Sequence, residues 1–143
     1  MGDVLREDLW FHRVDGVRIE NVLVDGELVV VRARATVERA GCSGCGVRSA
    51  RVRSRYVRRL ADSAVGHRRV VIELQVRRFR CSESRCAQTT FAEQVSGLTF
   101  RYGRRSAGLQ EVLQKLALML AGRAGARLVD SLGVPRAVPR CCA

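Results

Sequence analysis

Four of the six cysteines in the sequence are grouped in two close pairs. Cys42 and Cys45 form the first pair, Cys81 and Cys86 form the second, and 35 residues separate them. Zinc is typically held by four ligands at the corners of a tetrahedron, and a short turn rich in Gly and Ser can present two thiolates. The sequence therefore predicts a structural zinc site formed by Cys42, Cys45, Cys81 and Cys86. Four thiolates leave no open position for a substrate, so a catalytic metal is not expected.

Other uses of the cysteines and histidines fit the sequence less well. Disulfides belong to exported proteins, but the N-terminal segment MGDVLREDLW carries acids where a secretory signal carries basic residues. A redox Cys-x-x-Cys normally adjoins a βαβ pattern, which this sequence lacks. His12 and His67 do not stand at ligand spacing from the pairs, and adjacent cysteines such as Cys141 and Cys142 rarely fit one tetrahedron. We therefore assign none of these four residues to the metal.

Composition restricts the class of protein. A chain of 143 residues fits one domain, and 47% hydrophobic with 28% charged residues excludes disordered and collagen-like chains. The longest apolar run, Leu116–Ala121, is far shorter than the ~20 residues of a membrane span. We expect a protein without a membrane partner, located in the bacterial cytoplasm and associated with the nucleoid.

Charge is concentrated in the middle of the chain. The net charge is +12, and residues 40–105 carry +11 of it, whereas residues 1–39 carry −2. An excess of this size favours a polyanionic partner, because each neutralised phosphate releases a counterion. A nucleic acid is therefore expected to bind the middle third.

The expected fold class is α+β. Residues 1–39 form a β-hairpin scaffold, because Asp25-Gly26 stands between two β-branched runs. Residues 40–95 form a zinc-ribbon-like basic β module, whose two strands are joined by a loop at Val65–His67 and return both cysteine pairs to one end. Alternation along Val70–Val76 gives this ribbon an apolar side and a basic side.

Arginines on the ribbon are the candidate nucleic-acid contacts. Arg51, Arg53 and Arg55 alternate with other residues, so on a regular strand they share one face. The full candidate set is Arg51, Arg53, Arg55, Arg58, Arg59, Arg77, Arg78 and Arg80. Tyr56 and Phe79 could stack on bases, but we interpret them as core residues. No Gly-rich phosphate loop and no Ser/His/Asp set is present, so no catalytic residue is expected.

Residues 100–133 are expected to be helical. Apolar residues recur at three- and four-residue spacing from Leu109 to Leu120, and a shorter pattern covers Ala124–Leu132 after a stop at Gly122. This segment is either a helical hairpin or the start of a helix-turn-helix that is incomplete. Residues 134–143 contain two prolines and no apolar period, which predicts an irregular tail.

Several motifs in order resemble the N-terminal zinc-binding region of ISL-three family insertion-sequence transposases. They are Cys42-x2-Cys45-Gly46, the run from Ser54 to Asp62, the run from Val76 to Cys81, Cys86, and the run from Thr90 to Glu93. The run from Gly122 to Leu128 resembles the approach to the helix-turn-helix of that family. The resemblance covers roughly residues 10–133.

This resemblance implies a DNA-binding module. In that family the zinc module and the helix-turn-helix bind the terminal inverted repeats of the element, and a later DDE domain with three metal-binding carboxylates cuts and joins DNA. The chain ends before such a domain, so we expect a truncated transposase that is not itself an enzyme. We interpret the tail, from about Pro135 onward, as the scar of a frameshift, which the nucleotide sequence of the gene would test.

Two other classes of function stay open. A stand-alone zinc ribbon could bind single-stranded RNA or act in regulation, although aromatic residues make up only 5% of the chain. A protein-interaction module could use the Leu109–Leu120 stripe as a dimer face, but a core-facing helix gives the same pattern. The expected partners are double-stranded DNA at transposon ends and a second copy or an intact transposase. No small-molecule substrate is expected.

Overall fold

The computed structural model describes residues 11–133 except 13 and 121–122. The described residues form a five-stranded sheet, a small two-stranded sheet and helices α2 and α3, which confirms the α+β class. The strands are β1 (Val17–Asp25), β2 (Leu28–Ala35), β3 (Ala40–Gly41), β4 (Arg48–Ser49), β5 (Val52–Val65), β6 (Arg68–Arg80) and β7 (Thr90–Ala92), and the helices are α2 (Ala107–Leu120) and α3 (Arg123–Ser131). The tail at residues 134–143, its frameshift interpretation, the stop at Gly122 and the N-terminal segment lie outside the described residues.

One five-stranded sheet joins the two halves of the strand region. Its order is β1-β2-β6-β5, with β7 paired to β6. Two antiparallel hairpins, β1–β2 and β5–β6, turn at Gly26 and at Gly66-His67, where φ is +55°, +55° and +63°. Strands β2 and β6 are parallel neighbours, so residues 1–39 and 40–95, which the sequence analysis separates, contribute to the same sheet.

The alternating apolar residues of β6 form the centre of the core. Val70, Ile72, Leu74 and Val76 are fully buried, as their period-2 pattern predicts. The parallel register sets Val29, Val31 and Ala33 of β2 opposite the first three of them. The rest of this cluster is Phe11, Ile19, Leu60, Val95 and Leu98.

A β-bulge alters the arginine pattern of β5. Val52 is paired with Phe79, whereas Ser54 is paired with Arg78, so one extra residue lies between them on β5. A bulge of this kind shifts the alternation of side chains between the two faces of the sheet, so Arg51 and Arg55 do not lie on the same face. Arg55 is paired with Arg77, away from the core side of the sheet. The structure therefore divides the row of three arginines that the sequence pattern predicts.

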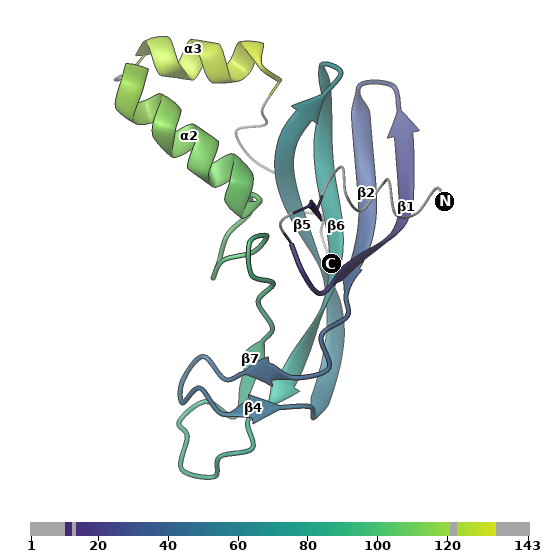
Figure 1. Ribbon diagram of the computed structural model, residues 1–143, viewed down its shortest axis with the longest axis vertical. Coiled ribbons are helices and arrows are strands. Elements are labelled where there is room, and N and C mark those ends of the chain that lie inside the picture. Colours follow the sequence, from purple (N-terminus) through teal and green to yellow (C-terminus); the bar gives the residue numbers. More distant parts are fainter. Residues whose placement is uncertain (1–10, 13, 121–122, 134–143) are drawn as a thin grey trace.

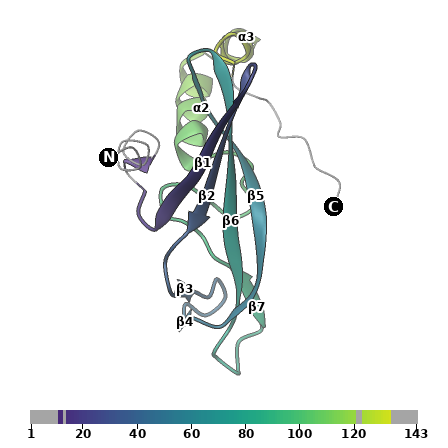
Figure 2. The ribbon, with the colours of Figure 1, turned by 90° about the vertical axis from the view of Figure 1, so that its right-hand side faces the viewer.

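The helices and the cysteine turns lie at opposite ends of the long β5–β6 hairpin (Figures 1 and 2). Residues 104–106 add to the edge of β5, where the Ala61 N–H donates to the Arg104 carbonyl at 2.9 Å. The Ser106 hydroxyl then caps α2 by accepting from the Leu109 N–H at 3.1 Å, and it donates to Asp62 at 2.6 Å. Leu109 packs on Ala61, together with Leu113. Within the described residues, neither helix is long and apolar enough to cross a membrane.

Candidate metal centre and arginine surfaces

Two short hairpins position the four candidate metal ligands. The turn between β3 and β4 carries Cys42 and Cys45, and the loop between β6 and β7 carries Cys81 and Cys86. The first turn is closed by Gly46, whose φ is +76° and whose N–H donates to the Cys42 carbonyl at 2.8 Å. Strands β5 and β6 form a long antiparallel hairpin, so the chain that leaves the β3–β4 turn comes back beside it at the β6–β7 loop. Both cysteine pairs therefore meet at one end of the sheet (Figure 1), here called the zinc end.

The four sulfur atoms fit one zinc ion. All four lie within 4.8 Å of one another. The Cys42 and Cys86 sulfurs are 3.9 Å apart, and those of Cys45 and Cys81 are 3.5 Å apart. A tetrahedron with Zn–S bonds of about 2.3 Å has S–S edges of about 3.8 Å, which matches both distances. Cys42, Cys45, Cys81 and Cys86 are therefore placed as the ligands of a structural zinc ion.

Backbone amides stabilise these sulfurs as thiolates. The N–H groups of Gly44, Glu83 and Gln88 each donate to the sulfur two residues earlier, on Cys42, Cys81 and Cys86, at 3.4 Å. These bonds turn the amide dipoles toward the negative charge that the ligands carry when they bind a cation. The set is thus arranged for thiolate coordination.

The thiols affect one another's ionisation. Backbone N–H groups of Cys45 and Gly44 lower the pKa of the Cys42 thiol to about 7. At Cys81 the Glu83 N–H also lowers the pKa, but desolvation and the neighbouring thiols outweigh it and raise the pKa to about 12. The group as a whole must lose protons when a cation binds, so its affinity for zinc rises with pH.

A small aromatic cluster supports the metal centre from one side. Phe79 and Phe91 are buried and stacked, with ring centroids 5.8 Å apart, and they contact Cys42. Burial of Phe79 agrees with its interpretation as a core residue. On another side, the Gln88 carbonyl oxygen accepts a hydrogen bond from the Ser43 hydroxyl at 2.6 Å, which ties the second cysteine loop to the first.

The arginines predicted to bind nucleic acid fall into several environments. Arg51, Arg53 and Arg80 are exposed and line a hollow of about 390 Å³ beside Cys81 and Cys86. We call these three the zinc-end arginines. Arg55 and Arg77 line a second hollow, of about 340 Å³, on the sheet face opposite the main core. Arg59 lies on that face as well, 3.5 Å from Glu73. Arg78 lines a third hollow, together with Arg58.

Two of these arginines are held by the protein itself. Arg58 donates to Gln94 and to the Phe100 and Gly103 carbonyls at 2.8 to 3.2 Å, and burial lowers its pKa. Arg77 binds the buried Glu93 carboxylate at 2.8 Å and donates to the Val37 carbonyl. Their guanidinium groups therefore fix loops to the sheet.

Sequence reasoning missed two arginines beside Arg55. Arg18 and Arg34 are paired across β1 and β2, both are exposed, and both line the same hollow as Arg55 and Arg77. They lie in the N-terminal segment, whose net charge of −2 gave no reason to select them. Only the parallel pairing of β2 with β6 brings them to the ribbon. We call Arg18, Arg34 and Arg55 the basic face.

Loss of one ligand is expected to release the metal and loosen only the zinc end. A Cys45→Ser variant should fall from one zinc per chain to almost none, because structural zinc sites of this type contribute about 10–16 kcal/mol through all four ligands. Amide exchange should rise at residues 40–49 and 81–92 but stay slow in β2 and β6, which have a separate core. Ser82→Ala, at an exposed position of the second cysteine loop, is the control and should keep its zinc. Unchanged exchange at residues 40–49 after zinc loss would contradict this account.

Gly44 provides a test of how closely the turns approach. A Cβ atom at this position would lie 3.2 Å from the Cys86 sulfur and 3.2 Å from the Gln88 carbonyl oxygen. The added methyl group of Gly44→Ala should push Gln88 and Cys86 away from the first turn and so disturb the contacts around the metal ligands. Disturbance of such outer-shell contacts should weaken zinc binding about tenfold, and competition with a chelator measures this change. In the matched variant Gly41→Ala the added atom stays 3.6 Å from its neighbour, so zinc affinity should not change. Equal affinities in the two variants would show that the approach is looser.

Comparison with known proteins agrees with this geometry. Residues 38–86, which contain all four ligands, match the family described as the zinc-finger of transposase IS204/IS1001/IS1096/IS1165. Comparisons with curated proteins and with solved structures give no match. The match covers the cysteine motifs of the resemblance noted above, and it does not extend to the helices. Residues 38–86 therefore form a zinc-binding segment of the type carried by the N-terminal region of ISL-three transposases.

Proposed function

We propose that this chain is a zinc-stabilised module that binds double-stranded DNA, and that its targets are the terminal inverted repeats of an insertion sequence. The observation that carries the proposal is the position of the zinc-end arginines, which line a hollow beside Cys81 and Cys86 at the metal centre of a transposase-type zinc finger. In this role the described residues contribute DNA binding, as the zinc-binding part of a transposase in which cutting and joining belong to a separate DDE domain.

The charge on the two surfaces supports a duplex partner. The hollow lined by Arg51, Arg53 and Arg80 contains one acid among its described residues, Glu83. The hollow lined by Arg18, Arg34 and Arg55 contains none, and Glu20 forms an ion pair with Arg34 at 3.3 Å from outside it. Exposed arginines of this kind neutralise phosphates, and their planar groups can also bind the edge of guanine in the major groove.

The spacing of the basic face suits a phosphate backbone. Arg18 and Arg34 are direct partners on neighbouring strands, and Arg55 lies two strands beyond Arg34, opposite Arg77 on β6. Arg34 is opposite Gln75 on β6, whose partner on β5 is Val57, so Arg55 is offset by two residues from the row of Arg18 and Arg34. All three nevertheless line one hollow on the same face of the sheet. Contacts of this type position a protein on DNA, whereas base contacts specify the sequence.

The metal supplies rigidity rather than chemistry in this scheme. Zinc bound by four thiolates has no open position, and when bound it would join the β3–β4 turn to the β6–β7 loop. Arg51 and Arg80 stand next to these elements, and the Arg80 N–H donates to the Arg51 carbonyl at 2.8 Å. A fixed zinc end thus fixes the arginines beside it.

Salt dependence of duplex binding tests the proposal. If about six phosphates are neutralised, the log–log slope of affinity against salt should be about −5, and each of Arg51→Ala, Arg53→Ala and Arg80→Ala should reduce it by about 0.9. Arg69→Ala, near the opposite end of β6, is the charge-matched control and should leave the slope unchanged. Fluorescence anisotropy with a labelled duplex measures both. A flat salt dependence, or equal effects of Arg69 and Arg53, would contradict the proposed surface.

A second copy of the chain is the protein partner that we propose. Helix α2 packs the buried Leu109 and the partly buried Leu113 against Ala61, so these two members of the expected dimer stripe are used within the chain. However, Leu118 and Met119 near its end are 86% and 81% exposed. Large apolar side chains in such positions are typical of interaction surfaces.

Light scattering tests the dimer. Leu118→Glu should convert a dimer to a monomer, because a charge cannot be buried there without a partner. Gln114→Glu, on an exposed position of the same helix, is the control and should leave the molar mass unchanged. A wild-type chain that is monomeric at all concentrations would rule out this partner.

A further inference from the structure

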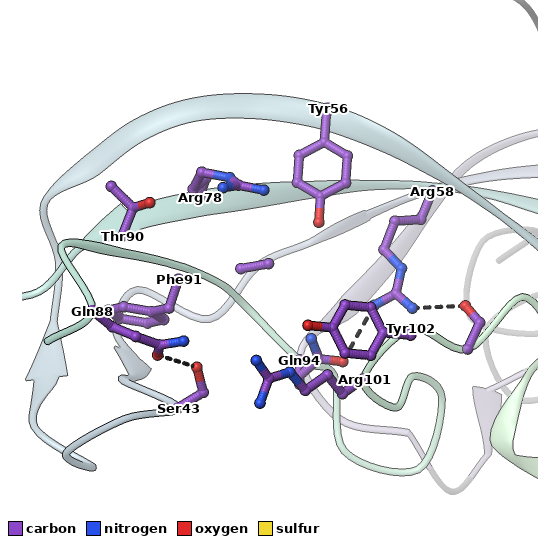
Figure 3. Close-up of a pocket in the computed structure, with 12 residues that line it drawn as sticks. Ser43, Tyr56, Arg58, Arg78, Gln88, Thr90, Phe91, Gln94, Arg101 and Tyr102 are labelled. Carbon is purple, nitrogen blue, oxygen red and sulfur yellow. Dashed lines mark hydrogen bonds between the residues drawn. The ribbon is translucent and has the colours of Figure 1, made fainter.

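A third hollow lies beside the zinc end and differs from the two arginine surfaces in its chemistry. Its volume is about 480 Å³, within the range of pockets that bind small ligands. We call it the tyrosine groove and define it by Tyr56, Arg78, Gln88, Gln94, Arg101 and Tyr102. Figure 3 shows Tyr56 and Arg78 projecting from the sheet, Gln88 at the end near Ser43, and Arg101 and Tyr102 on the other side.

Tyr102 is held in an unfavourable and exposed position. Its φ is +60°, in the left-handed region, and its side chain is 85% exposed. Such backbone conformations cost of order 1–3 kcal/mol in a non-glycine residue and cluster at ligand-binding sites. The loop is fixed because Arg58 donates to the carbonyls of Phe100 and Gly103, on both sides of Tyr102. The backbone that carries the ring is thus fixed before any ligand arrives.

The remaining groups match the parts of a nucleotide. The Arg101 guanidinium lies 5.1 Å from the centre of the Tyr102 ring, which leaves the second ring face for another planar group. Gln88 and Gln94 use their carbonyl oxygens as acceptors, while their amide nitrogens have no hydrogen bond within the described residues. None of the described residues that line the groove is acidic. Planar stacking, amide donors and positive charge together suit a base and its phosphate.

We propose that the tyrosine groove binds an unpaired nucleotide of a DNA strand that continues from the duplex. Tyr102 stacks on the base, Gln88 or Gln94 donates to its edge, and Arg78 binds the phosphate. A base within a duplex cannot enter, because both of its faces are covered by its neighbours, whereas a single-stranded base offers a free face. This inference rests on the proposed duplex binding, because the duplex delivers the strand to the groove.

Three labelled DNA probes separate the inference from the proposed function. They are a blunt duplex, the same duplex with a short single-stranded extension, and the same extension without bases, tested on the zinc-loaded full chain by fluorescence anisotropy. The extension with bases should bind about tenfold more tightly than the abasic one, because stacking on an aromatic ring is specific to bases. The two extensions carry equal charge, so phosphate contacts cannot produce this difference.

Variants of the groove and of the basic face provide the controls. Tyr102→Asn should abolish the tenfold difference, since Asn tolerates the left-handed backbone but offers no ring, and Tyr102→Phe should retain it. Arg55→Ala should weaken all three probes alike, because Arg55 lies outside the groove. Zinc content checks that the zinc end of each variant is folded, and slow amide exchange in β2 and β6 checks the sheet.

Four results would overturn one proposal or the other. Equal binding of the two extensions, or an undiminished difference in Tyr102→Asn, would overturn the groove as a nucleotide site. Preference for an RNA extension over the DNA one would overturn the assignment to a DNA strand. Failure of the blunt duplex to bind, with a difference between the extensions still present, would overturn the proposed duplex surface and leave the groove supported.

Discussion

The approach of four sulfur atoms to one position is the constraint that organises the zinc end of the molecule. Strands β3 and β4 have two residues each and β7 has three, which is too short for independent stability. The buried cluster there contains only Cys42, Phe79 and Phe91. A metal ion is what such small elements need to hold one arrangement. The rest of the sheet does not share this need, because twelve buried residues form its own core.

This division has a consequence for binding. The zinc-end arginines lie next to the elements that zinc joins, and part of the tyrosine groove lies on them. The Ser43–Gln88 hydrogen bond connects a ligand turn directly to the groove. Arg18 and Arg34 lie on strands packed by the main core. Metal binding therefore controls the order of one set of charged surfaces, while the other set stays in place with the sheet.

Local sequence signals predicted much of the fold and the metal centre. The hairpin turns take positive φ at Gly26 and at Gly66-His67, whereas Asp25 is the last residue of β1 and pairs with Leu28, so the Asp25-Gly26 signal placed the first turn one residue early. Alternation along Val70–Val76 marks the core face, so both hairpins follow from short-range chemistry. The four ligands could be identified because zinc restricts residue type and spacing strongly. Helices at 107–120 and 123–131 agree with the apolar period.

Features that depend on tertiary neighbours could not be predicted in the same way. The bulge between Val52 and Ser54 separates arginines that a regular strand would align. The parallel pairing of β2 with β6 places Arg34 beside the β5–β6 ribbon. The net negative charge of its N-terminal segment gave no reason to select it as a nucleic-acid contact. Tyr56 looked like a core residue, yet it is 37% exposed and lines the groove. In each case the deciding interaction joins residues that are distant in the sequence.

X-ray absorption spectroscopy at the zinc edge of the purified chain tests the central claim most directly. The account predicts one zinc ion per chain surrounded by four sulfur atoms at about 2.3 Å, with no nitrogen or oxygen in the first shell. A nitrogen or oxygen ligand, or a chain that folds at residues 40–92 with no metal bound, would contradict it.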